Sequence, residues 1–398
     1  MSNIDYIINS LKIANVFLNN FEETPDALIY HVSTLKSKQS CPCCGSLHSV
    51  VHDYRKQKIK DVSIHRKTVI IILNKRRYAC KNCGKKYYEH FDFICRYKRT
   101  TKRLNINVYL DLSKIKSMKQ IADENNVSQY FVQNTLDHTI APTHSPTNII
   151  SIDEFRGNAN GEKFQCILTD PIRKVILDVL PNRNTTYLDN YFRKLKDKSN
   201  IKYVVMDMWK PYAELAKRHF KNAIIIIDRY HFVRQVTWAI ENIRKRIQKH
   251  LTKENRLFFK HSKKLLLTPK EKLTLQEQEL LYVMFGFSEE LRVAYEFKTW
   301  FYEILNNSKT KEQAKKELKE WIYTVRESGI KEFGECIRSF TNWFDPICNG
   351  IVYPYNNGYT EGKNNKIKVL KRISYGYRTI KNLRKRILLI NEKSSVSN

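Results

Sequence analysis

The sequence has few of the features that mark secreted, membrane-spanning or disordered proteins. Its longest aliphatic runs, residues 69–73 and 223–227, have the length of a strand and are far shorter than a membrane span. The first residues, MSNIDYIINSLKIANVF, lack a basic start and a small-residue cleavage site, so we expect no secretory signal. With only 11 Gly and 10 Pro among 398 residues and a hydrophobic fraction of 42%, we expect two or three folded domains.

Acidic residues are scarce relative to basic ones. The chain has 71 Lys and Arg against 40 Asp and Glu, a formal net charge of +31. Residues 51–103 hold 17 basic and four acidic side chains, and residues 359–386 hold ten basic side chains and one acid, Glu361. Positive charge spread in this way along a folded chain favours a polyanionic partner, nucleic acid before membrane.

The nine cysteines do not form the pattern of a disulfide framework. Four of them form two CxxC pairs, Cys41 with Cys44 and Cys80 with Cys83, each followed by glycine. Two such knuckles can place four thiolates around one structural Zn²⁺, as in a zinc ribbon, whereas unmetallated buried thiols are the simpler alternative. Cys43 is a spare thiol that could compete as a ligand. Metal-binding thiols of this kind suit a reducing cytosol.

Residues 117–140 have the pattern of two helices joined by a short turn. Ile121 and Ala122 should face inward, and Ser128 should cap the second helix. This is the pattern of a helix-turn-helix, although any two-helix corner looks similar. Its exposed face would present four side chains to DNA base edges: Gln129, Tyr130, Gln133 and Asn134. The segment APTHSPTN at 141–148 is the expected domain boundary.

After residue 148 the pattern predicts a mixed α/β sheet. The stretches IISIDEF, KFQCILTD, KVILDVL, KYVVMD and AIIIID are five strand candidates, with helical segments before the fourth and fifth. Residues 229–345 read as almost wholly helical.

Three acids are candidates for a catalytic metal site. Asp153 lies near the end of the first strand and Asp207 ends the fourth, so both emerge at one edge of the sheet if these strands are adjacent and parallel. Glu361 heads the terminal basic helix and could be brought over them. Converging carboxylates require a divalent cation, and two Mg²⁺ ions, with Mn²⁺ as an alternative, suit displacement at phosphorus.

Each of these acids could also have a purely structural role. Asp residues at strand ends commonly form turns, and Glu361 could be an acid favoured by the helix dipole. Asp228 is a competing third ligand, and we interpret His231 and Asn365 as residues that line the site, in roles not assigned. Charge and helical face predict that five basic residues contact phosphate: Lys363, Lys366, Lys368, Lys371 and Arg372.

These motifs together resemble the transposases of the ISL-three family of bacterial insertion sequences. The resemblance rests on IDEF at 152–155, VVMDMWKPY at 204–212, DRYHFV at 228–233 and NNGYTEGKNNKIKVLKRISYGYR at 356–378, together with the zinc and helix-turn-helix motifs. It implies a DDE transposase with an RNase H-like core and the triad Asp153, Asp207 and Glu361. It also implies double-stranded DNA as partner, at least a homodimer on DNA, and a bacterial cytoplasmic, nucleoid-associated location.

The expected organisation has five parts. They are an N-terminal helix and connector (1–40), a zinc-ribbon domain (41–98), a helix-turn-helix domain (99–141), a catalytic core (149–231 and 346–392) and a helical insertion (232–345). The N-terminal helix is expected from Ile4, Ile7, Ile8, Leu11 and Leu18.

Two rival functions remain open at this stage. A non-catalytic DNA-binding regulator would use the zinc and helix-turn-helix modules alone, and it predicts that the three acids lie far apart. A junction-resolving nuclease would need the same acids but no reader of specific DNA ends, so the N-terminal modules argue against it.

Overall fold

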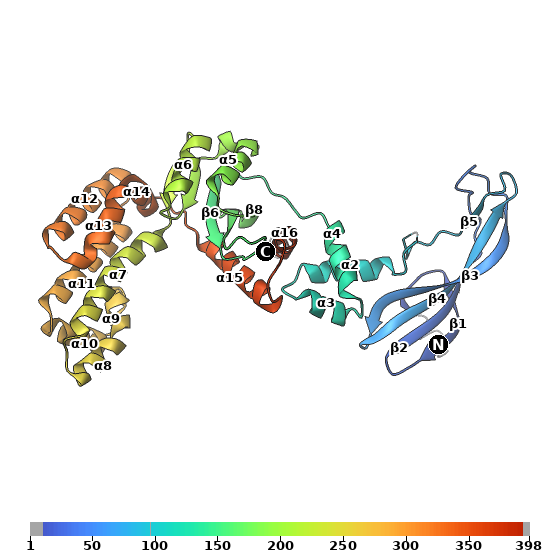
Figure 1. Ribbon diagram of the computed structural model, residues 1–398, viewed down its shortest axis with the longest axis horizontal. Coiled ribbons are helices and arrows are strands. Elements are labelled where there is room, and N and C mark those ends of the chain that lie inside the picture. The colour runs from blue at the N-terminus through green and yellow to red at the C-terminus, as the bar shows by residue number, and fades with distance from the viewer. Residues whose placement is uncertain (1–10, 96, 393–398) are drawn as a thin grey trace. The chain divides into compact units, whose positions relative to one another are not determined.

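The computed structural model describes residues 11–95 and 97–392, which form two compact units (Figure 1). The first unit contains the described residues up to Pro142, together with 369–377 and 381–392. The second contains Thr143–Lys368 and Arg378–Ile380. The division at Pro142 falls within the Pro-containing segment 141–148. Each unit is described separately below.

The first unit begins with a five-stranded sheet. Its strands are β1 (Val16–Glu23), β2 (Ala27–Thr34), β3 (Ser49–Ile64), β4 (Lys67–Cys80) and β5 (Lys86–Tyr88). The order is β1-β2-β4-β3, with β2 parallel to β4 and β5 paired to β4. β3 and β4 form a long antiparallel hairpin whose two-residue turn, His65–Arg66, has both residues at positive φ, as such turns require.

The expected helix and connector in residues 1–40 are therefore corrected for residues 16–34. Leu28, Tyr30 and Val32 are buried at every second position of β2, which is the period of a strand. Leu18 lies in β1 and packs against the same core. The candidate helix positions Ile4, Ile7 and Ile8 lie outside the described residues.

Three short helices follow the sheet in the first unit: α2 (Lys102–Leu112), α3 (Met118–Glu124) and α4 (Gln129–His138). Ser128 caps α4 by accepting a hydrogen bond from the Phe131 amide, as predicted. Ile121 and Ala122 are buried, also as predicted. The start of α2 is joined to β3 through buried Asp61, whose carboxylate accepts a hydrogen bond of 2.6 Å from Oγ1 of the helix-capping residue Thr101.

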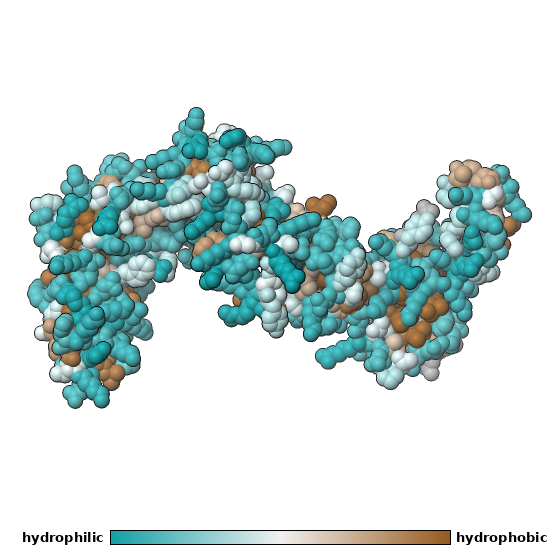
Figure 2. All heavy atoms as spheres, viewed as in Figure 1, coloured by the Kyte–Doolittle hydropathy of each residue, from teal (hydrophilic) through white to brown (hydrophobic). Residues whose placement is uncertain are grey.

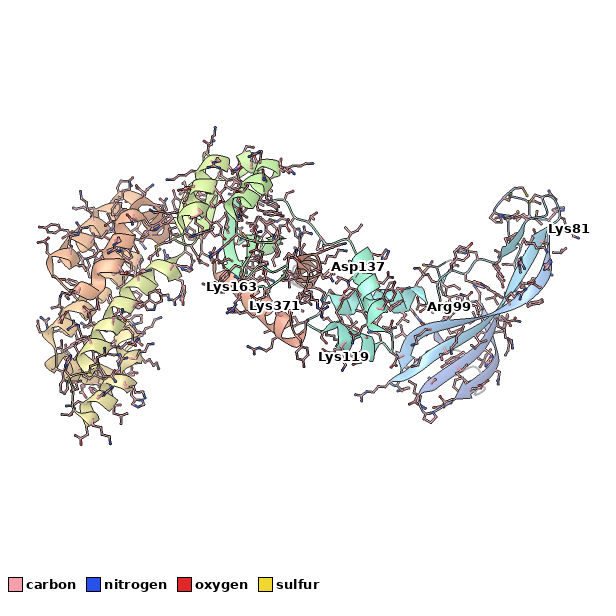
Figure 3. All side chains as sticks on the ribbon, viewed as in Figure 1. Lys81, Arg99, Lys119, Asp137, Lys163 and Lys371 are labelled. Carbon is pink, nitrogen blue, oxygen red and sulfur yellow. The ribbon has the colours of Figure 1, made fainter. Side chains whose placement is uncertain are left out.

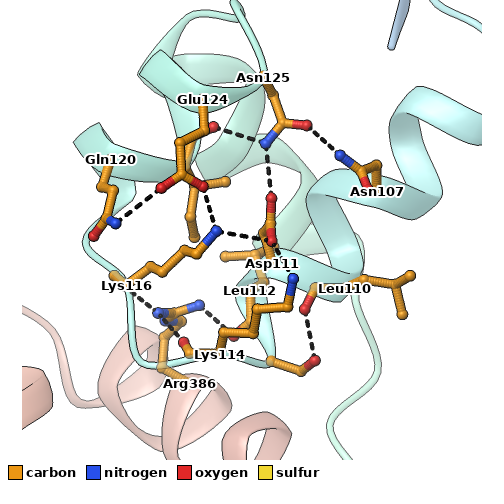
Figure 4. Close-up of polar contacts among 12 residues, drawn as sticks. Asn107, Leu110, Asp111, Leu112, Lys114, Lys116, Gln120, Glu124, Asn125 and Arg386 are labelled. Atoms are coloured by element: carbon orange, nitrogen blue, oxygen red, sulfur yellow. Dashed lines mark hydrogen bonds and ion pairs between the residues drawn. The ribbon is translucent and has the colours of Figure 1, made fainter. Parts of the chain in front are cut away.

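Helix α16 (Ile380–Glu392) packs against these three helices, not against the catalytic core to which its residues were assigned. Its Arg386 is fully buried and donates hydrogen bonds to the carbonyls of Leu112, Lys114 and Lys116 (Figure 4). The same close-up shows Asn125 donating to Asp111 at 2.9 Å. A polar network thus holds the carboxyl end of α2 in place.

The second unit contains the mixed five-stranded sheet that the sequence predicted. Its strands are β6 (Ile149–Phe155), β7 (Gln165–Asp170), β8 (Val175–Leu180), β9 (Tyr203–Met206) and β10 (Ile224–Ile227), in the order β10-β9-β6-β7-β8. β6, β9 and β10 are parallel, whereas β7 and β8 are antiparallel to their neighbours. Helices α5 (Thr185–Lys194) and α6 (Lys210–His219) precede β9 and β10, respectively.

The helical segment after β10 is also as predicted. It comprises α7 (Arg229–Gln248), α8 (Lys253–His261), α9 (Lys263–Leu267), α10 (Leu275–Gly286), α11 (Glu289–Asn307), α12 (Lys311–Glu327), α13 (Gly334–Asn342) and α14 (Phe344–Val352). Its centre is Trp321, fully buried against the rings of Phe301, Phe333 and Phe340. Helix α15 (Gly358–Ile373) then returns to the sheet, and its last residues belong to the first unit.

None of the helices in the described part of the chain combines the length and apolar character needed to cross a bilayer. The face seen in Figure 2 is mainly hydrophilic, in keeping with the high net charge. Figure 3 labels basic side chains on several elements, among them Lys81 at the cysteine-bearing end of β4 and Lys119 on α3.

Candidate active site and zinc centre

The register of the parallel strands aligns three aspartates. Ser151 in β6 lies opposite Val205 in β9, and β9 and β10 begin and end level with each other. Continuing this pairing places Asp153, Asp207 and Asp228 at one level on three neighbouring strands. Parallel neighbours are about 4.8 Å apart, so the three carboxylates share one edge of the sheet.

The first turn of α15 is attached to the middle of this sheet by buried hydroxyl and amide groups. Thr360 is fully buried, with its Oγ1 2.7 Å from Thr169 Oγ1 and 3.1 Å from Ser151 Oγ. Ser151 also donates to Asn357 Oδ1 at 2.5 Å. These contacts, which no motif predicted, fix the start of the helix just before Glu361. The available signal was a serine inside the otherwise apolar start of β6, IISI.

Two further contacts tie α15 directly to the aspartates. The Asn357 amide donates to Asp228 Oδ1 at 2.8 Å, and Asn364 Nδ2 donates to Asp153 Oδ2 at 2.9 Å. Glu361 lies between Asn357 and Asn364 in the sequence and is half-buried. The helix therefore brings its acid over the carboxyl ends of the parallel strands.

Among the described residues, Asp228, His231 and Glu361 form a group whose oxygens and ring nitrogen lie within 4.8 Å of one another. Of the three acids predicted to converge, Glu361 belongs to this group, whereas Asp153 and Asp207 do not. His231 Nε2 also lies 2.9 Å from Asp207 Oδ1. His231 thus connects the aspartate of β9 to the aspartate of β10 and to the glutamate. The His231 imidazole is therefore a member of the carboxylate group and does more than line it.

The electrostatics of the site are those of crowded carboxylates. Burial, and then the charge of Asp207, raise the pKa of Asp153 to about 7. Burial and nearby carboxylates also raise the pKa of Asp228 and of Glu361. Burial alone would lower the pKa of His231, but its hydrogen bond to Asp207 and the surrounding acids raise it. A site with this excess of negative potential favours cations.

These donors fit a hard divalent cation. Carboxylate oxygens suit Mg²⁺ and Mn²⁺, and a neighbouring imidazole extends the set toward Mn²⁺. Asn365 is exposed and accepts a hydrogen bond from Lys368 Nζ at 3.2 Å, so its side chain is turned away from the buried side of α15.

The four predicted cysteines form a second centre at the end of the β3–β4 hairpin. Their sulfurs lie within 4.8 Å of one another, with Cys41 to Cys83 and Cys44 to Cys80 each separated by 3.6 Å. A Zn–S distance of about 2.3 Å implies sulfur separations of about 3.8 Å in a tetrahedron, so the group fits structural zinc. Cys43 is exposed and outside this group.

The backbone of each knuckle also favours metal binding. Gly45 and Gly84 have φ of +72° and +71°, a conformation that allows each amide to turn back on the first cysteine of its pair. Backbone hydrogen bonds from Cys83 and Asn82 outweigh partial burial and lower the pKa of Cys80 to about 6. A thiolate is therefore available at this position near neutral pH.

The predicted phosphate-contacting residues of α15 do not all face outward. Lys366, Lys368 and Arg372 are exposed, and Lys371 is partly exposed. Lys363 is 6% exposed, and its ammonium lies 5.0 Å from the centre of the Tyr359 ring. Its expected outward position is wrong because it precedes buried Ile367 by four residues and so shares its helical face. Burial lowers the pKa of Lys363 to about 8.

The predicted base-reading residues of α4 differ in exposure. Gln129 and Tyr130 are exposed, while Gln133 and Asn134 are partly buried. Gln133 already donates to Asp137 at 3.0 Å and accepts from Asn382 of α16 at 3.2 Å. Gln133 is thus engaged within the first unit.

The parallel strands of the second unit end in acids, and a returning helix adds a glutamate to them. Together with a separate group of four thiols, this defines a mixed α/β protein whose cysteine group is consistent with structural zinc. Residues 150–387 match the family model for ISL3 transposases of the DDE type, and residues 37–83 match the model for the zinc finger of transposases IS204/IS1001/IS1096/IS1165. The chain therefore belongs to the ISL3 family of DDE transposases, which are polynucleotidyl transferases. The family predicted from the sequence motifs is confirmed.

Two relatives show how far the similarity extends. The chain is 25% identical over 354 residues to the transposase for insertion sequence element IS1001 of Bordetella parapertussis, covering 85% of each chain. It is 30% identical over 93 residues to an ATP-dependent protease of Lactococcus lactis subsp. lactis, covering 20% of this chain and 30% of that protein. The second similarity is too limited in extent to carry a functional argument.

Proposed function

We propose that this transposase binds the terminal inverted repeats of an insertion sequence and catalyses DNA cleavage and strand transfer with Mg²⁺, or with Mn²⁺ in its place. The observation that carries the proposal is the alignment of Asp153 and Asp207 on adjacent parallel strands. Helix α15 brings Glu361 to the same edge, where its carboxylate lies beside Asp228 and His231. The strand order and the returning helix agree with an RNase H-like core, as the family resemblance implies.

In this proposal Asp153, Asp207 and Glu361 hold the divalent cations. When bound by these residues, Mg²⁺ would offset charge on the scissile phosphate and would favour a nucleophile at neutral pH. Asp228 acts as a positioning residue, because its carboxylate accepts the Asn357 amide and so fixes the start of α15. His231 holds Asp207 in place through the 2.9 Å contact.

The two reaction steps balance without a covalent enzyme intermediate. In cleavage, the oxygen of water bonds to phosphorus, the bond from phosphorus to the 3′ oxygen breaks, and that oxygen leaves as a hydroxyl with the proton of water. In strand transfer, this 3′-hydroxyl oxygen bonds to a target phosphorus and the target's own 3′ oxygen leaves as a hydroxyl. The site contributes positioning and charge stabilisation to both steps.

The first unit supplies DNA recognition in this proposal. Helices α2, α3 and α4 act as a helix-turn-helix, with Gln129 and Tyr130 the exposed candidates at the start of α4. The zinc ribbon contacts phosphates through its basic side chains. Because an element has two ends, the functional form on DNA is at least a homodimer.

The test is cleavage of a supercoiled plasmid that carries the element with both of its ends. We expect Mg²⁺-dependent cutting that D153N, D207N and E361Q each reduce roughly 10²–10³-fold, with DNA binding retained. Glu327→Gln, which changes an exposed glutamate on α12, is the matched control and should cut like the wild type. Cutting that survives in all three site variants would refute the assignment.

The regulator hypothesis makes the opposite prediction. A chain that only binds DNA would bind the element ends and leave the plasmid intact in Mg²⁺ and in Mn²⁺. The proximity of the acids supports the enzyme, because a regulator has no need to bring carboxylates together beside a basic helix.

A further inference from the structure

Helix α7 carries an exposed ladder of two aromatic rings with an arginine between them. Tyr230 and Trp238 are 53% and 47% exposed. The Arg234 guanidinium lies 4.0 Å from the centre of the Trp238 ring and 5.7 Å from that of Tyr230. The spacing of four residues places all three on one side of the helix. We call these three residues the α7 ladder.

The ladder stands on the exposed side of a helix whose other side is packed. The opposite side of α7 packs Phe232, Val236 and Ile240 into the core, and Trp321 is fully buried in the helical segment. Single exposed aromatic residues are ordinary, but two rings held by a stacked guanidinium form an ordered surface for a planar ligand.

The ladder begins at the carboxylate site and leads away from it. Asp228 immediately precedes α7 and His231 lies in its first turn. From His231 to Trp238 the helix rises about 10 Å, at 1.5 Å per residue. Nucleotides are about 3.4 Å apart along a duplex strand and farther apart in an opened one, so Trp238 lies within about three nucleotides of a phosphate in the site.

The charges along this side of α7 favour a nucleic acid strand. Arg234, Lys245 and Lys249 are exposed on it. Glu241 is the single acid within residues 229–248, and it is buried against Arg244 at 2.9 Å. A phosphate backbone would therefore meet positive charge along the helix, and its bases would meet the rings.

We infer that the α7 ladder stacks an unpaired nucleobase of the DNA strand that enters the carboxylate site, within about three nucleotides of the phosphate that reacts. The inference rests on the proposed function, since that function brings DNA to the site. Stacking on an aromatic face tolerates any base, so the ladder holds an opened strand without reading its sequence. It binds single-stranded or forked DNA more tightly than closed duplex.

The experiment uses the full-length protein and two fluorescein-labelled probes, an oligothymidylate of about 20 nucleotides and a duplex of the same length. Fluorescence anisotropy gives the two dissociation constants for the wild type, W238A, W238F and the control Tyr323→Ala, which removes an exposed ring on α12. We expect W238A to weaken oligothymidylate binding roughly ten-fold and to leave duplex binding unchanged. W238F should retain most of the affinity because it keeps a ring.

Three results would overturn the inference. W238A could bind oligothymidylate as tightly as the wild type, or it could lose equal affinity for both probes. It could also leave both affinities intact while light scattering shows a smaller assembly, which would make the ladder a protein interface. Plasmid cleavage is scored separately. If the wild type does not cut the plasmid but W238A still loses affinity for oligothymidylate alone, the proposed function is rejected and the inference about the α7 ladder is supported.

Discussion

Replacing Lys298 should remove a steep pH dependence from the stability of the second unit. Lys298 lies on α11 and is fully buried, and its ammonium donates hydrogen bonds of 2.7 Å to the carbonyls of Leu266 and Thr268. Burial lowers its pKa from 10.5 to about 7. Between these two values the unfolded chain binds more protons than the folded one, so stability should rise with pH across this window.

The size of the effect follows from the shift. Each pH unit at which the two states differ by one proton changes the free energy of unfolding by about 1.4 kcal/mol. Lys298 should therefore make the wild type roughly 2 to 3 kcal/mol more stable at pH 9 than at pH 7. K298M removes this contribution, although it also leaves two carbonyls without their donor, which lowers stability by a pH-independent amount.

The assay is urea unfolding followed by tryptophan fluorescence at several pH values between 7 and 9. All five tryptophans of the sequence, residues 209, 238, 300, 321 and 343, belong to the second unit, so the signal reports on that unit. The informative quantity is the wild-type free energy minus that of K298M, plotted against pH. Lys319→Met, an exposed lysine on α12, controls for the loss of a surface charge. If this free-energy difference does not change between pH 7 and pH 9, Lys298 does not have the lowered pKa on which the prediction depends.

Two further predictions concern the first unit. C44S should reduce bound zinc, measured by elemental analysis of the purified protein, and should unfold the end of the β3–β4 hairpin, whereas C43S should retain the wild-type zinc content. R386M should lower the free energy of unfolding by roughly 3 kcal/mol, because it removes three hydrogen bonds to carbonyls and leaves that of buried Leu112 without the Arg386 donor. Lys381→Met, which changes an exposed lysine near the start of α16, is the matched control, and equal thermal stability of the two variants would contradict the role of Arg386.

Local sequence patterns were enough to predict most elements of the second unit and the four-cysteine group. The five strands of the mixed sheet follow from runs of β-branched residues bounded by turns, and the helical segment follows from its periodicity. The four thiols follow from two CxxC pairs, because knuckle geometry is set within a few residues. The family was likewise readable from motifs and their order.

Two features differ from the sequence-based expectation: the structure of residues 27–34 and the burial of Lys363. The alternation in residues 27–34 is that of a strand, and β2 pairs both with the preceding β1 and with β4, which begins more than 30 residues later. Lys363 was placed on the outer face of α15, although the helix docks through the face that contains it. A long lysine beside polar residues gives no local sign of burial, since its depth is set by what packs over it.

The sequence by itself determined which segments form strands and helices, which cysteines can share a metal and which acids stand at strand ends, because these depend on neighbours along the chain. Only the tertiary structure decided that Asp153, Asp207 and Asp228 lie level, since strand order and register are long-range properties. It also decided that His231 and Glu361 meet Asp228, and that α16 belongs with α2–α4 through Arg386. Burial and crowding of charges exist only once those distant segments have come together.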